Sequence, residues 1–182
     1  MQSEKVVLDS EAMRRTLVRI AHEIVERNGD ENIAIVGIHR RGAVLAGRVH
    51  ELVSELSDTE VPLGDIDIAF YRDDIATHRQ HPEVHASHLD FDIGSHTAVI
   101  VDDVLFTGRT VRAAIEALFD YGRPQRVQLA VLADRGHREL PIRPDYVGKN
   151  LPTARGERVN VRVEEVDGID EVTITQLQEA LA

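Results

Sequence analysis

The chain of 182 residues contains no cysteine. This absence excludes disulfide bonds and zinc sites built from thiolates. The sequence also has no apolar run long enough to cross a membrane, and its first residues mix charge and polarity without the apolar core of a signal peptide. We therefore expect a cytoplasmic protein with no membrane-bound part.

Lysine is nearly absent as well. Among the 21 basic residues only Lys5 and Lys149 are lysines, and all the others are arginines. Arginine suits bidentate contacts with phosphate groups, although a bias in genome composition would also explain the scarcity of lysine. The net charge of −11 argues against a surface that binds nucleic acid over its whole extent, whereas a local basic patch is compatible with it.

The chain does contain a hydrophobic share of 42%, which suits one ordinary domain over residues 1–182. The spacing of the apolar residues predicts short strands that alternate with helices, with a polar, histidine-rich loop over 73–90. This order favours an α/β fold with a mostly parallel central sheet flanked by helices. The predicted helices span 10–27, 43–56 and 110–121, and the predicted strands span 33–37, 66–70, 98–101, 127–133, 146–147, 159–163 and 172–174.

The most informative segment runs from Val99 to Thr110. An apolar run ends at Asp102 and Asp103, and a short loop with hydroxyl groups and Gly108 leads into a helix. The N–H groups of such a loop and helix start can hold a phosphate. The carboxylates can accept hydrogen bonds from sugar hydroxyls or help to hold Mg²⁺. The pattern indicates a site for a sugar phosphate; the alternative is an ordinary turn with acidic caps in solvent.

Two further polar segments follow other predicted strands. Residues 39–42 follow the strand at 33–37, and residues 134–138 follow the strand at 127–133. Because the carboxyl ends of parallel strands meet at one edge of a sheet, we expect all three segments to converge. Arg40 and Arg41 form an anion site able to hold a diphosphate with Mg²⁺, with a solvated positive loop as the alternative.

Residues 99–110 resemble the signature by which type I phosphoribosyltransferases bind phosphoribosyl diphosphate (PRPP). Other segments narrow the resemblance to a bifunctional branch of that family, the pyrimidine operon regulatory proteins. The resemblance covers nearly the whole chain, and it implies the type I phosphoribosyltransferase fold with a small hood near the C-terminal half. The additional segments are 13–15, 19–23, 71–74, 122–124, 134–143 and 146–150.

The resemblance implies two activities. The first is a uracil phosphoribosyltransferase reaction, which makes UMP and diphosphate from uracil and PRPP with Mg²⁺. The second is binding of the messenger RNA leader of pyrimidine operons in the presence of UMP or UTP, which attenuates and so terminates transcription. Two subunits would pool their basic patches, so we expect a homo-oligomer, either a dimer or a tetramer. The alternatives are a nucleotide-sensing, RNA-binding regulator with weak or no catalysis, and a phosphoribosyltransferase for another base.

The resemblance also implies roles for individual residues. Asp102 and Asp103 would bind the ribose hydroxyls, with Mg²⁺ near them, and Arg41 would stabilise the leaving diphosphate, so these three are the expected catalytic residues. Arg138, in the hood segment, would lie near the uracil. The residues implied to bind PRPP or UMP are His39, Arg40, Arg41, Gly42, Asp102, Asp103, Val104, Leu105, Phe106, Thr107, Gly108, Arg109 and Thr110.

A flexible lid is expected to close over the substrates and exclude water. No side chain stands out as a general base. Two positions depart from the family pattern: Phe106 stands where many relatives have tyrosine, and Arg40 stands where threonine is common, which puts the mode of diphosphate binding in doubt. The expected lid residues are Tyr71, Arg72, Asp73 and Asp74.

A basic face of the first helix is the expected RNA-binding surface. Glu23 and Glu26 interrupt this face, and Val18 occupies a position where a polar residue would suit RNA better, so a solvated helix surface is the alternative. The histidines at 78, 81, 85 and 88 lack a regular ligand spacing, and we do not expect them to bind a metal. The expected RNA-binding residues are Arg14, Arg15, Arg19, His22 and Arg27.

Overall fold

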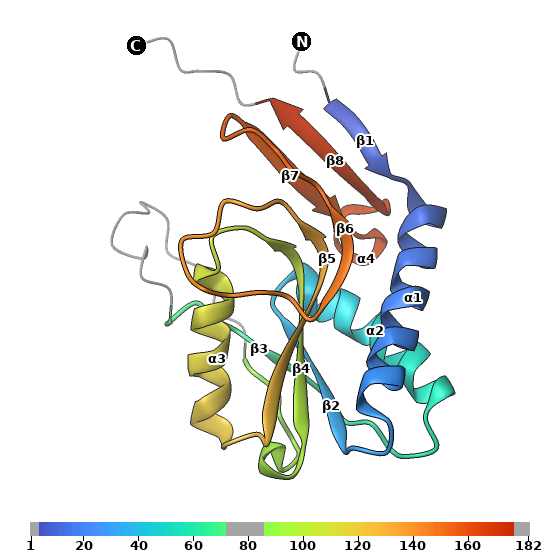
Figure 1. Ribbon diagram of the computed structural model, residues 1–182, viewed down its shortest axis with the longest axis vertical. Helices are drawn as coiled ribbons and strands as arrows, with labels where there is room; N and C mark the ends of the chain where they lie inside the picture. Colours follow the sequence, from blue (N-terminus) through green and yellow to red (C-terminus); the bar gives the residue numbers. More distant parts are fainter. Residues whose placement is uncertain (1–3, 72–85, 177–182) are drawn as a thin grey trace.

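A computed structural model describes residues 4–71 and 86–176 (Figure 1). Its centre is a five-stranded sheet in the order β3-β2-β4-β5-β6, and every neighbouring pair in it is parallel. Helices α1 and α2 cover one face and α3 covers the other. The predicted α/β class with flanking helices is therefore confirmed. The elements are α1 (Ser10–Asn28), β2 (Ile33–Ile38), α2 (Arg41–Leu56), β3 (Leu63–Ile66), η2 (Ile93–Ser95), β4 (Thr97–Leu105), α3 (Arg109–Tyr121), β5 (Arg126–Asp134) and β6 (Tyr146–Asn150).

A second, antiparallel sheet of three strands lies beyond the carboxyl ends of the central strands (Figure 1). It has the order β1-β8-β7, from β1 (Glu4–Leu8), β7 (Glu157–Arg162) and β8 (Glu171–Gln176), with the short helix α4 (Glu164–Asp167) between β7 and β8. The predicted pairing of the valine-rich strands at the C-terminal end is confirmed. Strand β1 was not predicted, since its first three residues are exposed and give no apolar alternation.

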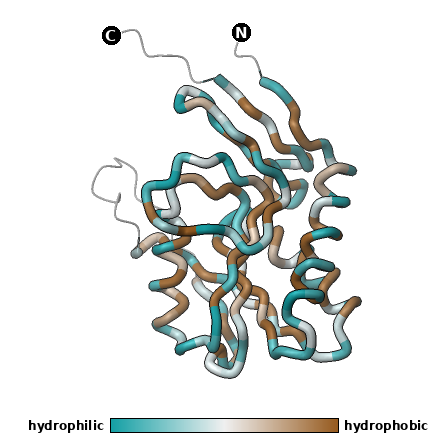
Figure 2. Tube along the Cα trace, in the orientation of Figure 1, coloured by the Kyte–Doolittle hydropathy of each residue, from teal (hydrophilic) through white to brown (hydrophobic). Residues whose placement is uncertain are grey.

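The inner central strands form around apolar runs, which fill β2 and much of β4 and β5. All six residues of β2 are buried, as are the first six of β4, which is expected for parallel strands covered on both faces. Figure 2 shows the hydrophobic residues along these strands. One core cluster also contains Leu8, Val161 and Val172 of the small sheet, so that sheet is packed onto the α1–α2 side of the central sheet. No described helix is long and apolar enough to cross a membrane.

Two predicted strands end four residues away from where the structure ends them, at residue 70 instead of 66 and at 101 instead of 105. The strand placed at 66–70 is β3, which ends at Ile66: Ala69 N–H donates to the Asp67 carboxylate at 2.7 Å, the chain turns, and Phe70 is 76% exposed. Strand β4 continues four residues beyond its predicted end because β5 pairs with it as far as Leu105. The two adjacent aspartates therefore lie inside the strand, not in the loop that follows it.

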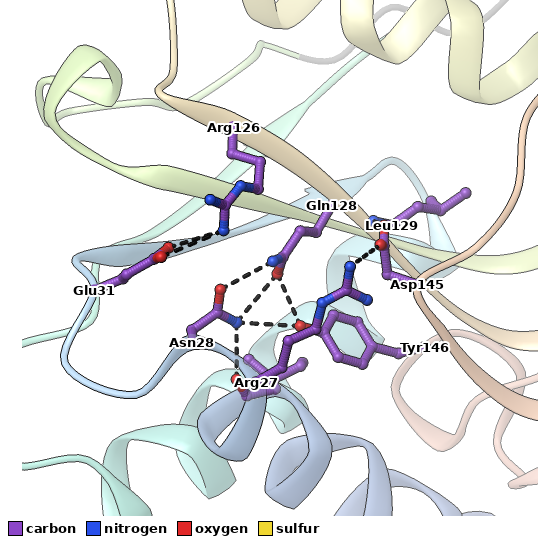
Figure 3. A network of polar contacts seen from close by, with 9 residues as sticks. Arg27, Asn28, Glu31, Arg126, Gln128, Leu129, Asp145 and Tyr146 are labelled. Atoms are coloured by element: carbon purple, nitrogen blue, oxygen red, sulfur yellow. Dashed lines mark hydrogen bonds and ion pairs between the residues drawn. The ribbon is translucent and has the colours of Figure 1, made fainter.

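A buried polar network ties the end of α1 to β5 and β6 (Figure 3). The side chains of Asn28 and Gln128 exchange hydrogen bonds at 3.1 and 2.9 Å, and the hydroxyl of Tyr146 donates to Gln128 at 2.8 Å. Arg27 lies over the Tyr146 ring. No buried side-chain polar atom of the described residues lacks a partner. The hydrogen bonds of the network therefore offset the cost of burying its polar groups while they fix α1 against the sheet.

Removing the Tyr146 hydroxyl tests this network. Tyr146→Phe is expected to lower the free energy of unfolding by about 1 kcal/mol, because Gln128 loses one donor while the packing stays. Chemical denaturation measures the change. Tyr121→Phe, at a tyrosine that is 48% exposed, is the matched control and should leave stability within about 0.5 kcal/mol of wild type. A Tyr146→Phe protein as stable as the control would show that the network does not hold α1.

Candidate active site

The two aspartates of β4 form the acidic centre of the site. Asp102 is 5% exposed and accepts a hydrogen bond from the Asp103 N–H at 3.0 Å, while Asp103 accepts one from the Val104 N–H at 2.8 Å. Burial, and next the charge of Asp103, raise the pKa of Asp102 well above its usual value. Burial likewise raises the pKa of Asp103, against the opposing effect of the Val104 N–H. The pair therefore holds its negative charge at a cost, which a cation or a hydroxyl donor would reduce.

Gly42 brings the start of α2 against this acidic centre. A Cβ atom at Gly42 would lie 2.8 Å from the carbonyl oxygen of Val101 and 3.3 Å from the carboxylate of Asp102. The 2.8 Å approach to a backbone oxygen cannot be made without a shift of the backbone. The absence of a side chain at this position thus allows the segment after β2 to contact the acidic pair, as the sequence predicts for converging strand ends.

The residues of the expected diphosphate segment point in different directions. The imidazole of His39 lies 2.6 Å from the Asp65 carboxylate, and the Asp65 carboxylate lies 3.2 Å from His88. The peptide bond between His39 and Arg40 is cis, and Arg40 is exposed at the start of α2. Arg41 forms a bidentate ion pair with Asp167 of α4, at 2.9 and 2.6 Å. Of these side chains, Arg41 is the cation that lies in the cleft beside Asp103.

The expected phosphate loop is short, because β4 ends at Leu105 and α3 begins at Arg109. Gly108 has a φ of 95°, a left-handed conformation that favours glycine, and it offers no side chain to cap α3. The Thr107 hydroxyl accepts from the Arg109 N–H at 3.3 Å. Leu105 is 1% exposed, so its side chain belongs to the core and only its backbone is available to a ligand. The first turn of α3 has the geometry of an anion site.

Arg138 supports this loop. Its guanidinium donates to the carbonyl oxygens of Phe106 and Ile142 at 2.8 and 3.0 Å and pairs with Asp134 at 2.5 Å. The Thr107 carbonyl also accepts from the N–H groups of residues 139 and 140. Arg138 lies in the segment between β5 and β6, outside the small three-stranded sheet. Its expected contact with uracil stays a prediction.

Arg135 lies in the segment 134–138 that was expected at this edge of the sheet, although the sequence analysis gave it no role of its own. It is 8% exposed, its guanidinium carbon lies 4.1 Å from the ring centre of Phe106, and burial lowers its pKa. It donates to the Thr153 hydroxyl at 3.2 Å and to the Glu157 carbonyl at 2.6 Å. Arg135 therefore connects the end of β5 to the start of β7 and helps to hold the small sheet over the site.

A cleft of about 450 Å³ separates the small sheet from the central strand ends. Arg41 of α2, Asp103 of β4 and Asp167 of α4 line part of it. The small sheet lines the rest, which the sequence analysis missed, although the polar residues between the buried valines of β7 were a signal for it. The lining residues of the small sheet are Glu4, Arg158, Val159, Asn160, Val161, Arg162, Thr175 and Gln176.

The lid prediction can be followed only at its first residue. The Tyr71 hydroxyl donates to Asp120 near the end of α3, which raises the pKa of Tyr71, and Arg112 donates to the Tyr71 carbonyl at 3.3 Å. Tyr71 is thereby attached to α3. Arg72, Asp73 and Asp74 lie outside the described residues.

The basic residues of α1 are largely engaged by neighbours. Arg14 and Arg15 pair with Glu11 at 2.9 and 3.5 Å, and Arg27 pairs with Asp145 at 2.9 Å. The ring of His22 lies 2.8 Å from the Val18 carbonyl oxygen. Arg19 pairs with Glu23 at 2.6 Å and also donates to the carbonyl oxygens of residues 147 and 148 in β6, at 3.1 and 2.6 Å. Arg19 therefore has a structural role, whereas Arg14 and Arg15 keep exposed side chains.

The donor set fits a magnesium ion that arrives with a phosphorylated ligand. Among residues 4–71 and 86–176 there is no group of three acidic or histidine side chains that could hold a metal by itself. Mg²⁺, however, usually takes one or two carboxylates and completes its shell with phosphate oxygens and water. Asp102 and Asp103 supply that number. Of the four spaced histidines, only His88 is described, and it contacts Asp65.

The chain matches the family described as phosphoribosyl transferase domain over residues 3–165. Its fold is similar to a hypoxanthine-guanine phosphoribosyltransferase of Bacillus anthracis, with a TM-score of 0.70 and 16% identity over 93% of this chain and 96% of that one. A hypoxanthine phosphoribosyltransferase of Trypanosoma cruzi gives a TM-score of 0.71 with 17% identity over 94% and 91%. At such identities the structures show the fold alone, and the family match shows that the chain is a phosphoribosyltransferase family member.

Curated relatives narrow this class. The bifunctional protein PyrR of Caldicellulosiruptor bescii is 57% identical over 178 residues, which cover 97% of this chain and 98% of that protein. The bifunctional protein PyrR of Listeria monocytogenes is 52% identical over 183 residues, covering 98% and 100%. Within the phosphoribosyltransferases, this chain belongs to the PyrR family, which confirms the resemblance found in the sequence.

Proposed function

We propose that this protein transfers the phosphoribosyl group of PRPP to uracil, forming UMP and diphosphate, and that it also binds pyrimidine operon leader RNA in response to UMP or UTP. Membership of the PyrR family supports both halves of the proposal. The observation that carries the catalytic half is the approach of Arg41 and the acidic pair at one edge of the sheet, next to a helix start able to hold a phosphate. A homo-oligomer in the cytoplasm is part of the same proposal.

The arrangement suits PRPP, whose ribose would be held through the 5′-phosphate at one end and the diphosphate at the other. The 5′-phosphate would lie at the start of α3, where Thr107, Thr110 and the N–H groups of the first helical turn favour an anion. Asp102 and Asp103 would accept hydrogen bonds from the ribose hydroxyls. Arg41 would contact the diphosphate on the opposite side of the ribose. Binding of this kind orients C1 of the ribose for attack.

The residues then act on the charges that develop during the transfer. As uracil N1 forms its bond to C1, the bond from C1 to the diphosphate oxygen breaks, the electron pair leaves with diphosphate and the N1 proton is lost. Asp102 and Asp103 would counter the positive character of the ribose, and Arg41 would stabilise the negative leaving group. Mg²⁺ held with Asp102 or Asp103 would supply further charge neutralisation for the diphosphate.

An assay with four bases separates this proposal from its alternatives. The protein is incubated with PRPP and Mg²⁺ together with uracil, adenine, guanine or hypoxanthine, and the nucleotide formed is measured. UMP as the dominant product is expected. A purine nucleotide would identify another base specificity, and binding of UMP without turnover would identify a sensor that does not catalyse the transfer.

The RNA-binding half depends on a small exposed patch. Arg14 and Arg15 lie on the outer side of α1 with side chains 66% and 65% exposed, and Glu11 offsets part of their charge. A single patch of this size binds RNA weakly, so pooling two copies in a homo-oligomer supports useful affinity. Binding should fall steeply as salt is added.

Arg15→Glu tests this surface. It is expected to weaken binding of a pyrimidine operon leader RNA by about tenfold, because one phosphate contact becomes a repulsion, and to leave UMP synthesis unchanged. Filter binding with and without UMP measures the first quantity. Arg123→Glu, beyond α3 on the other face of the sheet, is the matched charge control. Equal weakening in both variants would mean that RNA responds to net charge only, and would argue against an α1 surface.

A further inference from the structure

Arg41, which is proposed to bind diphosphate, already forms an ion pair with a carboxylate of the protein itself. Arg41 donates from Nε to Asp167 Oδ2 at 2.9 Å and from Nη2 to Asp167 Oδ1 at 2.6 Å. A bidentate fork of this kind occupies one of the two edges at which a guanidinium can contact two phosphate oxygens. The carboxylate of Asp167 and a bound diphosphate therefore compete for the charge and for part of the donors of Arg41.

Asp167 is held in place independently of Arg41. Its Oδ2 atom accepts a second hydrogen bond from the Val163 N–H at 2.9 Å, and its own N–H donates to the Val163 carbonyl at 2.7 Å. Arg48 of α2 fastens the surrounding turn through Glu165 and Asp170, at 2.6 and 2.8 Å. Asp167 would thus stay in position when its partner leaves.

The two side chains differ in their freedom to move. The side chain of Arg41 is 36% exposed and borders the cleft, whereas that of Asp167 is 17% exposed. The hydrogen bond from Arg41 lowers the pKa of Asp167, so this carboxylate is ionised throughout the neutral range. Its negative charge also faces the cleft, in which Asp103 is a second carboxylate.

We propose that Asp167 sets the affinity of the diphosphate site by holding Arg41 in the free protein and releasing it to the diphosphate group of PRPP. The proposal rests on the function proposed above. Binding then exchanges one ion pair for another, so the affinity of the site is lower than Arg41 alone would give. The release also frees Arg41 from α4, the short helix of the small sheet that covers the cleft.

Calorimetric titration with diphosphate and with PRPP, each with Mg²⁺, tests the proposal. Asp167→Asn removes the charge and keeps an acceptor for the Val163 N–H. It is expected to lower both dissociation constants by about five- to tenfold and to lower the KM for PRPP. Glu165→Gln removes one charge from the same helix at a residue that pairs with Arg48, and its dissociation constants should stay within about twofold of wild type.

The outcomes separate the two proposals. If wild type binds normally, unchanged or weaker binding by Asp167→Asn would overturn the role given to Asp167. Weaker binding would mean that Asp167 orients Arg41 for the ligand. Wild type that binds neither ligand would overturn the proposed function instead. Thermal denaturation checks that the variant is folded, and Asp167→Ser, which also removes the charge and keeps an acceptor, is the second variant if Asp167→Asn is not.

Discussion

Replacing Asp102 by asparagine is expected to lower the rate of UMP formation on the order of 10²-fold while making the protein more stable. The rate falls because a neutral amide cannot counter the positive character of the ribose or help to hold Mg²⁺. Stability rises because the variant no longer buries a carboxylate beside Asp103, a change worth about 1–2 kcal/mol at neutral pH. Steady-state kinetics and chemical denaturation measure the two effects.

The gain in stability depends on pH, and its sign follows from the raised pKa values. Folding favours the protonated form of the pair, since burial raises the pKa of Asp102 and of Asp103. The contribution of these shifts to the stability of wild type is therefore fully present below the pKa of an unfolded aspartate, near 4. This contribution is lost as the pH rises through the raised pKa values. Wild type and Asp102→Asn should be equally stable at pH 4 and diverge above it. A variant that is less stable at pH 7, or that retains the wild-type rate, would contradict the role given to Asp102.

Replacing Gly42 by alanine is expected to reduce turnover by about 10- to 100-fold and the free energy of unfolding by about 1–3 kcal/mol. The added Cβ would lie 2.8 Å from the Val101 carbonyl oxygen and 3.2 Å from the Cα atom of Asp102. The first turn of α2 must then move away from β4, and Arg41 moves with it. The site loses its geometry although no charged group has been removed.

Gly47→Ala is the matched control for this substitution. Gly47 lies in the same helix, and a Cβ atom there would have no atom within 4 Å. Alanine is a better helix former than glycine, so this variant should gain up to about 1 kcal/mol and keep its turnover. A Gly42→Ala protein with normal turnover would show that the contact between α2 and β4 does not position Arg41.

The inner strands of the central sheet could be predicted from sequence because each contains a short apolar run. Residues 33–38 and 126–134 stand between turn signals, and such runs form strands in any α/β protein that covers both faces of its sheet. The end of β4 was harder to predict. Asp102 and Asp103 carry the pattern of a loop, and only the pairing with β5 keeps them extended and partly or fully buried.

The contacts that the small sheet and its neighbouring segments make with the site could not be predicted in the same way. Asp167 lies in an acidic stretch that looks like a solvated turn, and its partner Arg41 is 126 residues away in the chain. The segment of Arg135 was expected at this edge, but its contacts with Phe106, Thr153 and Glu157 could not be predicted, because they come from three other segments. Contacts between distant segments depend on the folded arrangement, which periodicity and spacing do not contain.

The small sheet joins β1, near the beginning of the chain, to β8, near its end, with Glu4 opposite Thr175. Both strands must therefore have been synthesised before this sheet can assemble. The parallel strands through β6 are complete earlier, and the first turn of α3 with them. During synthesis, the edge of the central sheet that is proposed to bind phosphate would thus form first and be exposed to solvent. The small sheet that covers it would form last.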